Sequence, residues 1–171
     1  MAHWVEKLSS RSYSFRNQPG FEIGRALLTP ERSKSGGDIY KLMRSVEPGD
    51  IILHLTDSAA FTGWSIARSK ASIVSAESRL WYRIELSGHA PLNPPLRRED
   101  FFKPPFSTDL QRIADGRGRN LFFEWRLRMR QGAYLTPLAP DVLTVLDAAY
   151  LRVAGRTISE QWSRKQPTSS T

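Results

Sequence analysis

Short apolar runs separated by turn-forming residues fill the middle of the chain. The run Ile51-Ile52-Leu53-His54-Leu55 has the length and β-branched content of a strand, and it follows the turn residues Pro48-Gly49-Asp50. A loop of small residues leads into a second run, residues 61–67, in which Gly63 stands beside Trp64. A glycine inside a strand marks a place where another group approaches the backbone closely. We therefore expect a strand pair at the centre of a small barrel.

Other segments carry the period of strands or of helices. Predicted strands cover residues 13–17, 25–29 and 80–86, with a turn and a short strand over 131–137. Predicted helices cover residues 38–46, 108–113 and 141–153, the last ending at Gly155. Short strands mixed with a few helices predict an α+β domain.

The remaining segments are harder to assign. Residues 68–79 are small and polar and predict a loop, while the prolines of residues 88–95 predict a crossover. Residues 121–130 fit a strand or a helix, and we interpret them as extended. We expect Phe101 and Phe102 to plug the barrel.

Length and composition predict a single domain. A chain of 171 residues with 40% hydrophobic content is long enough to bury a full core. We expect a loose leader over residues 1–12, one domain over residues 13–155, and a polar linker or tail over residues 156–171.

The charge balance favours a polyanionic partner. The chain has 25 Lys and Arg against 17 Asp and Glu, a formal net charge of +8 and a pI near 10.2. Arginine outnumbers lysine, which suits bidentate contacts with phosphates and bases. Basic composition alone is also compatible with a protein that binds no polyanion. No basic-then-apolar signal segment and no apolar run of membrane-spanning length occurs, so we expect a cytoplasmic protein without a membrane partner.

The chain lacks the patterns of the common enzyme sites. It has no cysteine, which excludes disulfides, a thiol nucleophile and cysteine-ligated zinc. Its histidines, at positions 3, 54 and 89, do not have the spacing of metal ligands, and no nucleophile elbow or phosphate loop is present. We therefore predict a binding module, not an enzyme, with no cofactor and no metal.

The order of several phrases resembles the EVE-like domains of the PUA superfamily, especially those fused to nucleases in bacterial modification-dependent restriction systems. The resemblance spans residues 13–155. It is carried by Asn17 at a strand end, Leu27-Leu28-Thr29-Pro30, Val46–His54, Phe61–Ala67, Trp81–Leu86, Pro91-Leu92 and Gly132–Leu138.

The resemblance implies a fold and a function. The fold is a PUA-like small mixed β-barrel of about five to six strands, flanked by two to four helices. The function is a DNA reader that flips a modified base of double-stranded DNA, 5-methylcytosine or 5-hydroxymethylcytosine, into an aromatic pocket. Such a reader serves as the specificity module of a restriction system, with nuclease activity in a fused or partner domain. The alternative is an RNA-binding PUA-like module or an N6-methyladenine reader, as in the related YTH domains.

Candidate pocket residues follow from the aromatic content and from the resemblance. Candidates for stacking on the base are Trp64, Trp81, Phe15 and Tyr134. Candidates for its edge and walls are Asn17, Asp57, Ser65, Leu28 and Thr29. Leu28 and Thr29 stand where relatives have a cage tryptophan, which favours cytosine over a methylated purine. Each candidate also has a structural interpretation: Trp64 as core, Asn17 as a turn residue and Asp57 as a loop cap.

Candidate phosphate contacts are arginines and a lysine near the predicted pocket strands and in the glycine–arginine loop. They are Arg16, Arg68, Lys70, Arg117, Arg119, Arg126 and Arg128. The alternative is that these charges only form solvated faces.

Overall fold

Seven strands and four α-helices make up most of the chain in this computed structural model, which describes residues 1–9, 22–33, 35–76, 78–117, 121–124 and 126–163. The strands are β1 (His3–Leu8), β2 (Ala26–Pro30), β3 (Ile51–Thr56), β4 (Ala60–Ala67), β5 (Ser72–Ala76), β6 (Arg79–Arg97) and β7 (Leu135–Pro137). The helices are α1 (Arg98–Phe101), α2 (Phe106–Arg117), α3 (Pro140–Ala154) and α4 (Ser159–Ser163), with a short 3₁₀ helix η2 (Lys41–Ser45).

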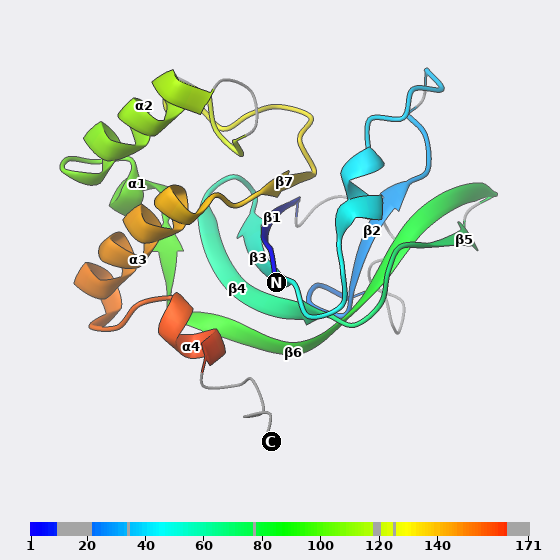
Figure 1. The fold of residues 1–171 in the computed structure, drawn as a ribbon, viewed down its shortest axis with the longest axis horizontal. Helices are drawn as coiled ribbons and strands as arrows, with labels where there is room; N and C mark the ends of the chain where they lie inside the picture. The colour runs from blue at the N-terminus through cyan, green and yellow to red at the C-terminus, as the bar shows by residue number, and fades with distance from the viewer. Residues whose placement is uncertain (10–21, 34, 77, 118–120, 125, 164–171) are drawn as a thin grey trace.

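The strands form one curled mixed sheet. Their order is β2-β6-β4-β3-β1-β7, and β5 pairs with β6. β1 runs parallel to β3, and the other strand pairs among the described residues are antiparallel. The long strands β4 and β6 bend strongly, so the sheet curls into a half-barrel (Figure 1). The predicted α+β class with a small barrel-like sheet is confirmed.

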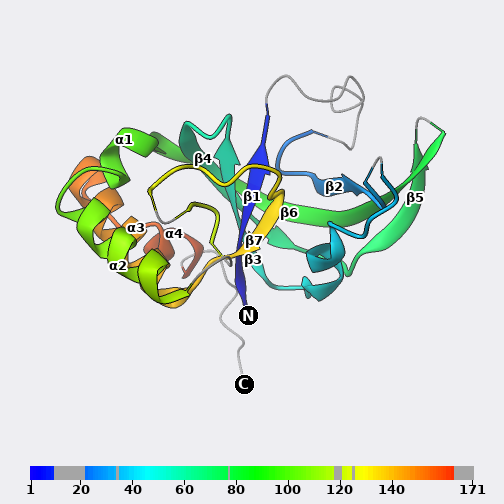
Figure 2. The same ribbon diagram turned by 90° about the horizontal axis from the view of Figure 1, so that it is seen from above.

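The two faces of the sheet belong to different hydrophobic cores. On β1, Val5 joins one core and Trp4 the other; on β3, Leu53 and Ile52 divide in the same way. This alternation follows from the two-residue period of a strand. Helices α1 to α4 cover the Val5 face, whereas β2, η2 and β5 lie on the other side (Figure 2). We call these the helix-side core and the barrel-side core.

The predicted leader is wrong for residues 3–8, which form β1 between β3 and β7. Leu8 and Trp4 are buried there, and so is the charged Glu6. The buried carboxylate of Glu6 interrupts the apolar alternation that would have predicted a strand. The segment belongs to the domain because its backbone completes the sheet.

The predicted linker is wrong for residues 159–163, which form α4. Trp162 is buried in the helix-side core, 5.3 Å from the ring of His3 and 6.0 Å from the ring of Trp64. Asp147 of α3 fixes the start of this helix by accepting from the backbone N–H groups of Ile158 and Ser159, at 2.9 and 3.0 Å. The domain therefore extends beyond residue 155.

Asp50, the last residue of the predicted turn, ties the start of β1 to β3. Its carboxylate accepts the backbone N–H of Ala2 at 2.7 Å, the indole N–H of Trp4 at 2.9 Å and the backbone N–H of Glu47 at 3.0 Å. Burial acts to raise the pKa of Asp50, but these hydrogen bonds outweigh it, and the pKa lies below its usual value. An ionised Asp50 thus holds the strand end in place.

The predicted strands over 25–29, 51–55, 61–67 and 80–86 are confirmed, as is the helix over 141–153 with Gly155 in the left-handed conformation at its end. The close approach expected at Gly63 is also present, because a Cβ there would lie 2.8 Å from the Ala90 carbonyl oxygen. Residues 13–17 lie outside the described residues.

Several segments differ from expectation. The predicted crossover over 88–95 is part of the 19-residue strand β6, and a register shift against β4 leaves Pro94 and Pro95 outside the paired positions. The predicted loop over 68–79 contains β5, and residues 38–46 form only the 3₁₀ helix. Phe101 packs in the helix-side core and does not plug the curl of the sheet. Residues 121–130 contain a single bridge, Phe123 to Met129, within their described part.

Candidate functional site

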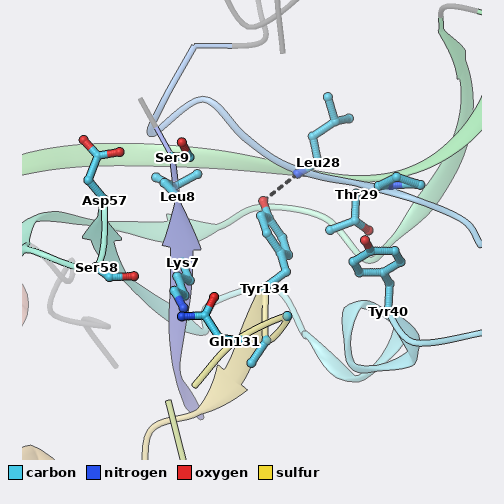
Figure 3. Close-up of a pocket in the computed structure, with 13 residues that line it drawn as sticks. Lys7, Leu8, Ser9, Leu28, Thr29, Tyr40, Asp57, Ser58, Gln131 and Tyr134 are labelled. Carbon is cyan, nitrogen blue, oxygen red and sulfur yellow. Dashed lines mark hydrogen bonds between the residues drawn. The ribbon is translucent and has the colours of Figure 1, made fainter. Parts of the chain in front are cut away.

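A cavity of about 400 Å³ opens where five chain segments meet (Figure 3). These segments are the end of β1, the end of β2, the residue before η2, the turn between β3 and β4, and the approach to β7. Its walls are Lys7, Leu8, Ser9, Leu28, Thr29, Pro30, Tyr40, Asp57, Ser58, Gln131, Gly132, Ala133 and Tyr134. The volume falls within the range of small-ligand pockets, roughly 300–1,000 Å³.

Tyr134 has a fixed position in this cavity. Its hydroxyl oxygen accepts the backbone N–H of Leu28 at 3.0 Å (Figure 3) and its O–H donates to the carboxylate of Glu6. The hydroxyl therefore joins β1 to β2 across the cavity. The ring is held in place without a ligand, which is the preorganisation that a stacking surface needs.

Glu6 continues into a buried polar ladder across four strands of the sheet. Its carboxylate lies 2.7 Å from His54 Nδ1, His54 Nε2 lies 2.8 Å from Ser65 Oγ, and Ser65 Oγ lies 3.1 Å from His89 Nδ1. Glu6, His54 and Ser65 are fully buried. With Glu6 ionised, His54 donates from Nδ1 and accepts the Ser65 hydroxyl proton at Nε2, so every member has a partner. Because Tyr134 is hydrogen-bonded to Glu6, the ladder helps to hold the tyrosine wall of the cavity in place.

Serine, histidine and glutamate in this order resemble the arrangement of a hydrolase triad. Ser65 is fully buried, however, and lines none of the described cavities. A substrate cannot reach its Oγ, so the geometry supports a structural role for the ladder.

Thr29 contributes a hydroxyl with no partner to the cavity wall. Its side chain points toward Tyr40 (Figure 3), the residue is 1% exposed, and Oγ1 makes no hydrogen bond with any described residue. An unsatisfied buried hydroxyl costs about 1–3 kcal/mol. A ligand with a polar edge would satisfy this group.

Lys7 and Gln131 form the middle of the cavity. Lys7 Nζ donates to the carbonyl of Arg130 at 2.5 Å, and burial lowers the pKa of Lys7 from its usual value. The Gln131 amide lies beside Lys7 (Figure 3) and can both donate and accept. Asp57 and Ser58 lie on the other side of Lys7 from Tyr134 (Figure 3), so the cavity has a tyrosine end and a turn end.

A larger groove of about 890 Å³ adjoins the turn end of the cavity. Asp57 and Ser58 belong to both walls. The other groove residues are Ala59, Ala60, Arg97, Arg98, Glu99, Phe102, Lys103, Arg126 and Leu127. Four cationic side chains and two carboxylates therefore line the groove.

The cavity brings together four of the predicted pocket residues: Leu28, Thr29, Asp57 and Tyr134. They come from three separate parts of the chain and meet because each lies at or beside the end of a strand. Their proposed contacts with a base remain predictions.

Three further candidates, Trp64, Trp81 and Ser65, do not line the cavity. Trp64 is 0% exposed in the helix-side core. Trp81 packs with Leu28 in a small cluster, and its indole N–H donates to the Ala76 carbonyl at 2.9 Å. Trp81 therefore supports the cavity wall through Leu28 instead of forming it.

The predicted phosphate contacts are spread over the chain. Arg126 lines the groove, whereas the exposed Arg128 does not. Arg68 and Lys70 follow the far end of β4 from the groove, and Lys70 pairs with Glu47 at 3.0 Å.

Other predicted contacts lie outside the described residues. Phe15, Arg16, Asn17 and Arg119 belong to segments that are not described. The backbone of Arg117 forms the last residue of α2.

Sequence reasoning missed Tyr40, Lys7 and Gln131 in the cavity and three of the four groove cations, Arg97, Arg98 and Lys103. A signal existed for Gln131, because it precedes Gly132 in the phrase that carries the resemblance, and Gly132 adopts a φ of 70°. Tyr40 carried no local signal, since only the tertiary fold brings η2 to β2.

Within the described ranges, no cluster of three or more potential metal ligands occurs. In the same ranges, no helix combines the length and apolar character needed to cross a membrane.

Comparisons with known proteins give the fold. No protein-family model matches the chain, and no curated protein matches it. Protein Atu2648 from Agrobacterium tumefaciens is 14% identical, with 92% of this chain and 99% of that chain covered and a TM-score of 0.50. The N-terminal domain of Staphylothermus marinus McrB is 14% identical, with coverages of 85% and 93% and a TM-score of 0.48. A protein from Pseudomonas putida is 11% identical, with coverages of 88% and 100% and a TM-score of 0.46. The chain thus shares an α+β fold with the Agrobacterium protein.

Proposed function

We propose that this chain is a DNA-binding reader that takes one modified cytosine, 5-methylcytosine or 5-hydroxymethylcytosine, out of the helix and into the cavity. The observation that carries the proposal is a preorganised cavity with two tyrosines and an unpartnered hydroxyl beside a cationic groove. The motif order that resembles EVE-like domains is a second support. The reader itself cuts nothing; a fused or associated nuclease domain supplies that activity in a restriction system.

The energies of base extraction fit the tyrosine end of the cavity. Removing a base from a duplex costs a few kcal/mol. Stacking on aromatic rings returns roughly 1–3 kcal/mol per base. Tyr134 and Tyr40 supply two rings, and the hydrogen bonds of the Tyr134 hydroxyl hold that ring in place before the base arrives. Stacking in the cavity thereby offsets the free-energy cost of extracting the base.

The difference in binding free energy between modified and unmodified cytosine is small. Discrimination therefore needs a cavity wall of defined shape. A buried methyl group contributes about 0.8 kcal/mol. Leu28 and Thr29 form the wall where relatives carry an aromatic residue, and Thr29 Oγ1 offers one hydrogen bond to a polar edge or a hydroxymethyl group. Asp57 stands at the turn end, where its carboxylate can accept from an exocyclic amino group near the groove.

A binding panel at fixed salt tests the proposal. We expect the chain to bind duplexes that carry 5-methylcytosine or 5-hydroxymethylcytosine several-fold more tightly than matched duplexes with cytosine. The panel includes N6-methyladenine duplexes and matching RNA, measured by fluorescence anisotropy. Equal affinity for every duplex would contradict base-specific reading. Preference for RNA or for N6-methyladenine would replace the proposal with the corresponding alternative.

Exchanging Thr29 for valine should separate binding from stability. Thr29→Val keeps the shape but removes an unsatisfied buried hydroxyl, so we expect it to raise the free energy of unfolding by about 1 kcal/mol or more. If the bound base uses this hydroxyl, affinity for the preferred duplex should fall about fivefold to tenfold, as for one lost hydrogen bond. Urea denaturation and anisotropy measure the two effects.

Thr136→Val is the matched control. Thr136 is also buried with an unpartnered hydroxyl, but it lies on β7 and does not line the cavity. It should stabilise the protein similarly and leave DNA affinity unchanged. A loss of affinity in both variants, or in neither, would remove Thr29 from the recognition site.

A further inference from the structure

The groove beside the cavity is built on rigid elements. Arg97 ends β6 and lies opposite Ala60 of β4 in the sheet. The backbone N–H of Arg98 donates to the Ala59 carbonyl at 2.7 Å, which joins the start of α1 to the turn after β3. Asp57 in that turn donates its backbone N–H to the Leu8 carbonyl at 2.7 Å. One turn is therefore anchored to the groove on one side and to the cavity on the other.

Charge and ring content indicate what the groove holds. Arg97, Arg98, Lys103 and Arg126 supply four cations, while Glu99 lies 3.8 Å from Arg97 as an exposed pair. Exposed pairs of this kind are weak and exchange readily for a phosphate contact.

Phe102 adds a half-buried ring to the groove. Its centroid lies 4.7 Å from Phe101 and 5.8 Å from Phe123, both edge-to-face, so the ring is held in position. Cations that track a backbone beside a fixed ring are the combination by which proteins bind nucleic-acid strands.

We infer that this groove holds the sugar–phosphate backbone of a nucleic-acid strand, and that its Asp57–Ser58 edge is where the strand passes from the groove into the cavity. Backbone binding in the groove does not depend on base identity. The position of the groove relative to the modified base rests on the proposed function. A nucleic-acid strand fits the cavity and the groove together because it joins a planar base to evenly spaced phosphates. An acidic protein segment would match the cations but not the adjoining cavity.

A pair of matched double variants tests the surface. Arg98→Ala with Lys103→Ala removes two groove cations, whereas the control variant, Arg112→Ala with Arg152→Ala, removes two exposed cations of α2 and α3 that line none of the described cavities. The groove variant should weaken binding to modified and unmodified duplexes by the same factor. Its slope of log affinity against log salt should fall by about 1.8 on a duplex, or about 1.4 on a single strand. The control variant should retain both the wild-type affinity and the wild-type slope.

Site-specific crosslinking tests the path of the strand. Because the chain has no cysteine, a single introduced cysteine gives a unique attachment point for a photo-crosslinker. Ala59→Cys lies in the groove wall, and Ser72→Cys on the exposed strand β5 is the control. The labelled Ala59→Cys protein should crosslink to nucleotides next to the modified base, and the labelled Ser72→Cys protein should not.

The outcomes separate the two proposals. If the groove variant loses affinity but no base preference exists in the wild type, the groove stands and the proposed function fails. If base preference exists but both double variants behave alike, the proposed function stands and the groove is overturned. Efficient crosslinking from Ser72→Cys with none from Ala59→Cys also overturns it. Variants are compared only after thermal melts show that each is folded.

Discussion

A chain that lacks residues 1–8 should fail to fold. Residues 3–8 of this segment form β1, whose removal leaves β7 without a partner strand and β3 paired only with β4. Trp4, Val5 and Leu8 are buried, and each such side chain contributes about 1.5–3 kcal/mol. The whole free energy of unfolding of a domain is only about 5–15 kcal/mol. We expect no cooperative transition in urea and a collapsed dispersion of amide signals in NMR spectra.

The control for this deletion is the full chain with a tag placed ahead of Met1, which is 71% exposed. The tagged chain should unfold with the same midpoint and the same denaturant slope as the untagged chain. A truncated chain that unfolds cooperatively near that midpoint would show that β1 is dispensable. The deletion thus tests whether the domain begins at the first strand or after it.

The second large effect is expected from His54→Ala. This change leaves the fully buried Glu6 without the partner that lies 2.7 Å away. Leaving a buried polar group without its hydrogen-bond partner costs about 1–3 kcal/mol, and more when the group is a carboxylate. The midpoint of urea unfolding should fall accordingly, while the denaturant slope stays unchanged.

Two milder variants distinguish this effect from a loss of packing volume. Glu6→Gln keeps the shape and can still accept from Tyr134 and donate to His54, so it should cost much less than His54→Ala. Ser65→Ala removes one hydroxyl and should cost about 1 kcal/mol. Equal destabilisation by all three changes would mean that the ladder acts only by filling space.

The sequence predicted the strands in which apolar residues dominate. Residues 51–55 were located from the length and β-branched content of their run, and residues 80–86 from their alternation. β1 was missed because Glu6 occupies its buried face, and its partner His54 lies 48 residues away. No local window contains both halves of that pair.

The orientation of Trp64 could not be predicted for a related reason. β4 has a register shift against β3 and others against β6, so Phe61 and Trp64 share the helix-side core although they are three residues apart. A bulge adds one residue and reverses the alternation that follows. A two-residue period therefore does not hold along β4, and the sequence alone could not show that Trp64, predicted as a stacking candidate, is buried in the helix-side core.

The cavity was predicted in part because its residues occur at strand ends, where turn chemistry is visible in the sequence. Asp57 and Tyr134 follow or precede recognisable strands, and Leu28 and Thr29 precede a proline. The groove could not be predicted, because Arg97 ends β6, Arg126 belongs to a separate segment after α2, and only the tertiary fold brings both to one surface.

The division of the sheet into two cores separates the requirements of folding from those of recognition. The helix-side core contains the larger set of buried aromatic side chains, whereas the cavity adjoins the barrel-side core through β2 and Tyr134. A library that randomises Tyr40 and Gln131 leaves the buried Leu28 and Thr29 and every aromatic ring of the helix-side core in place. Most members should therefore remain folded, which makes this wall a practical starting point for selecting binders of other bases.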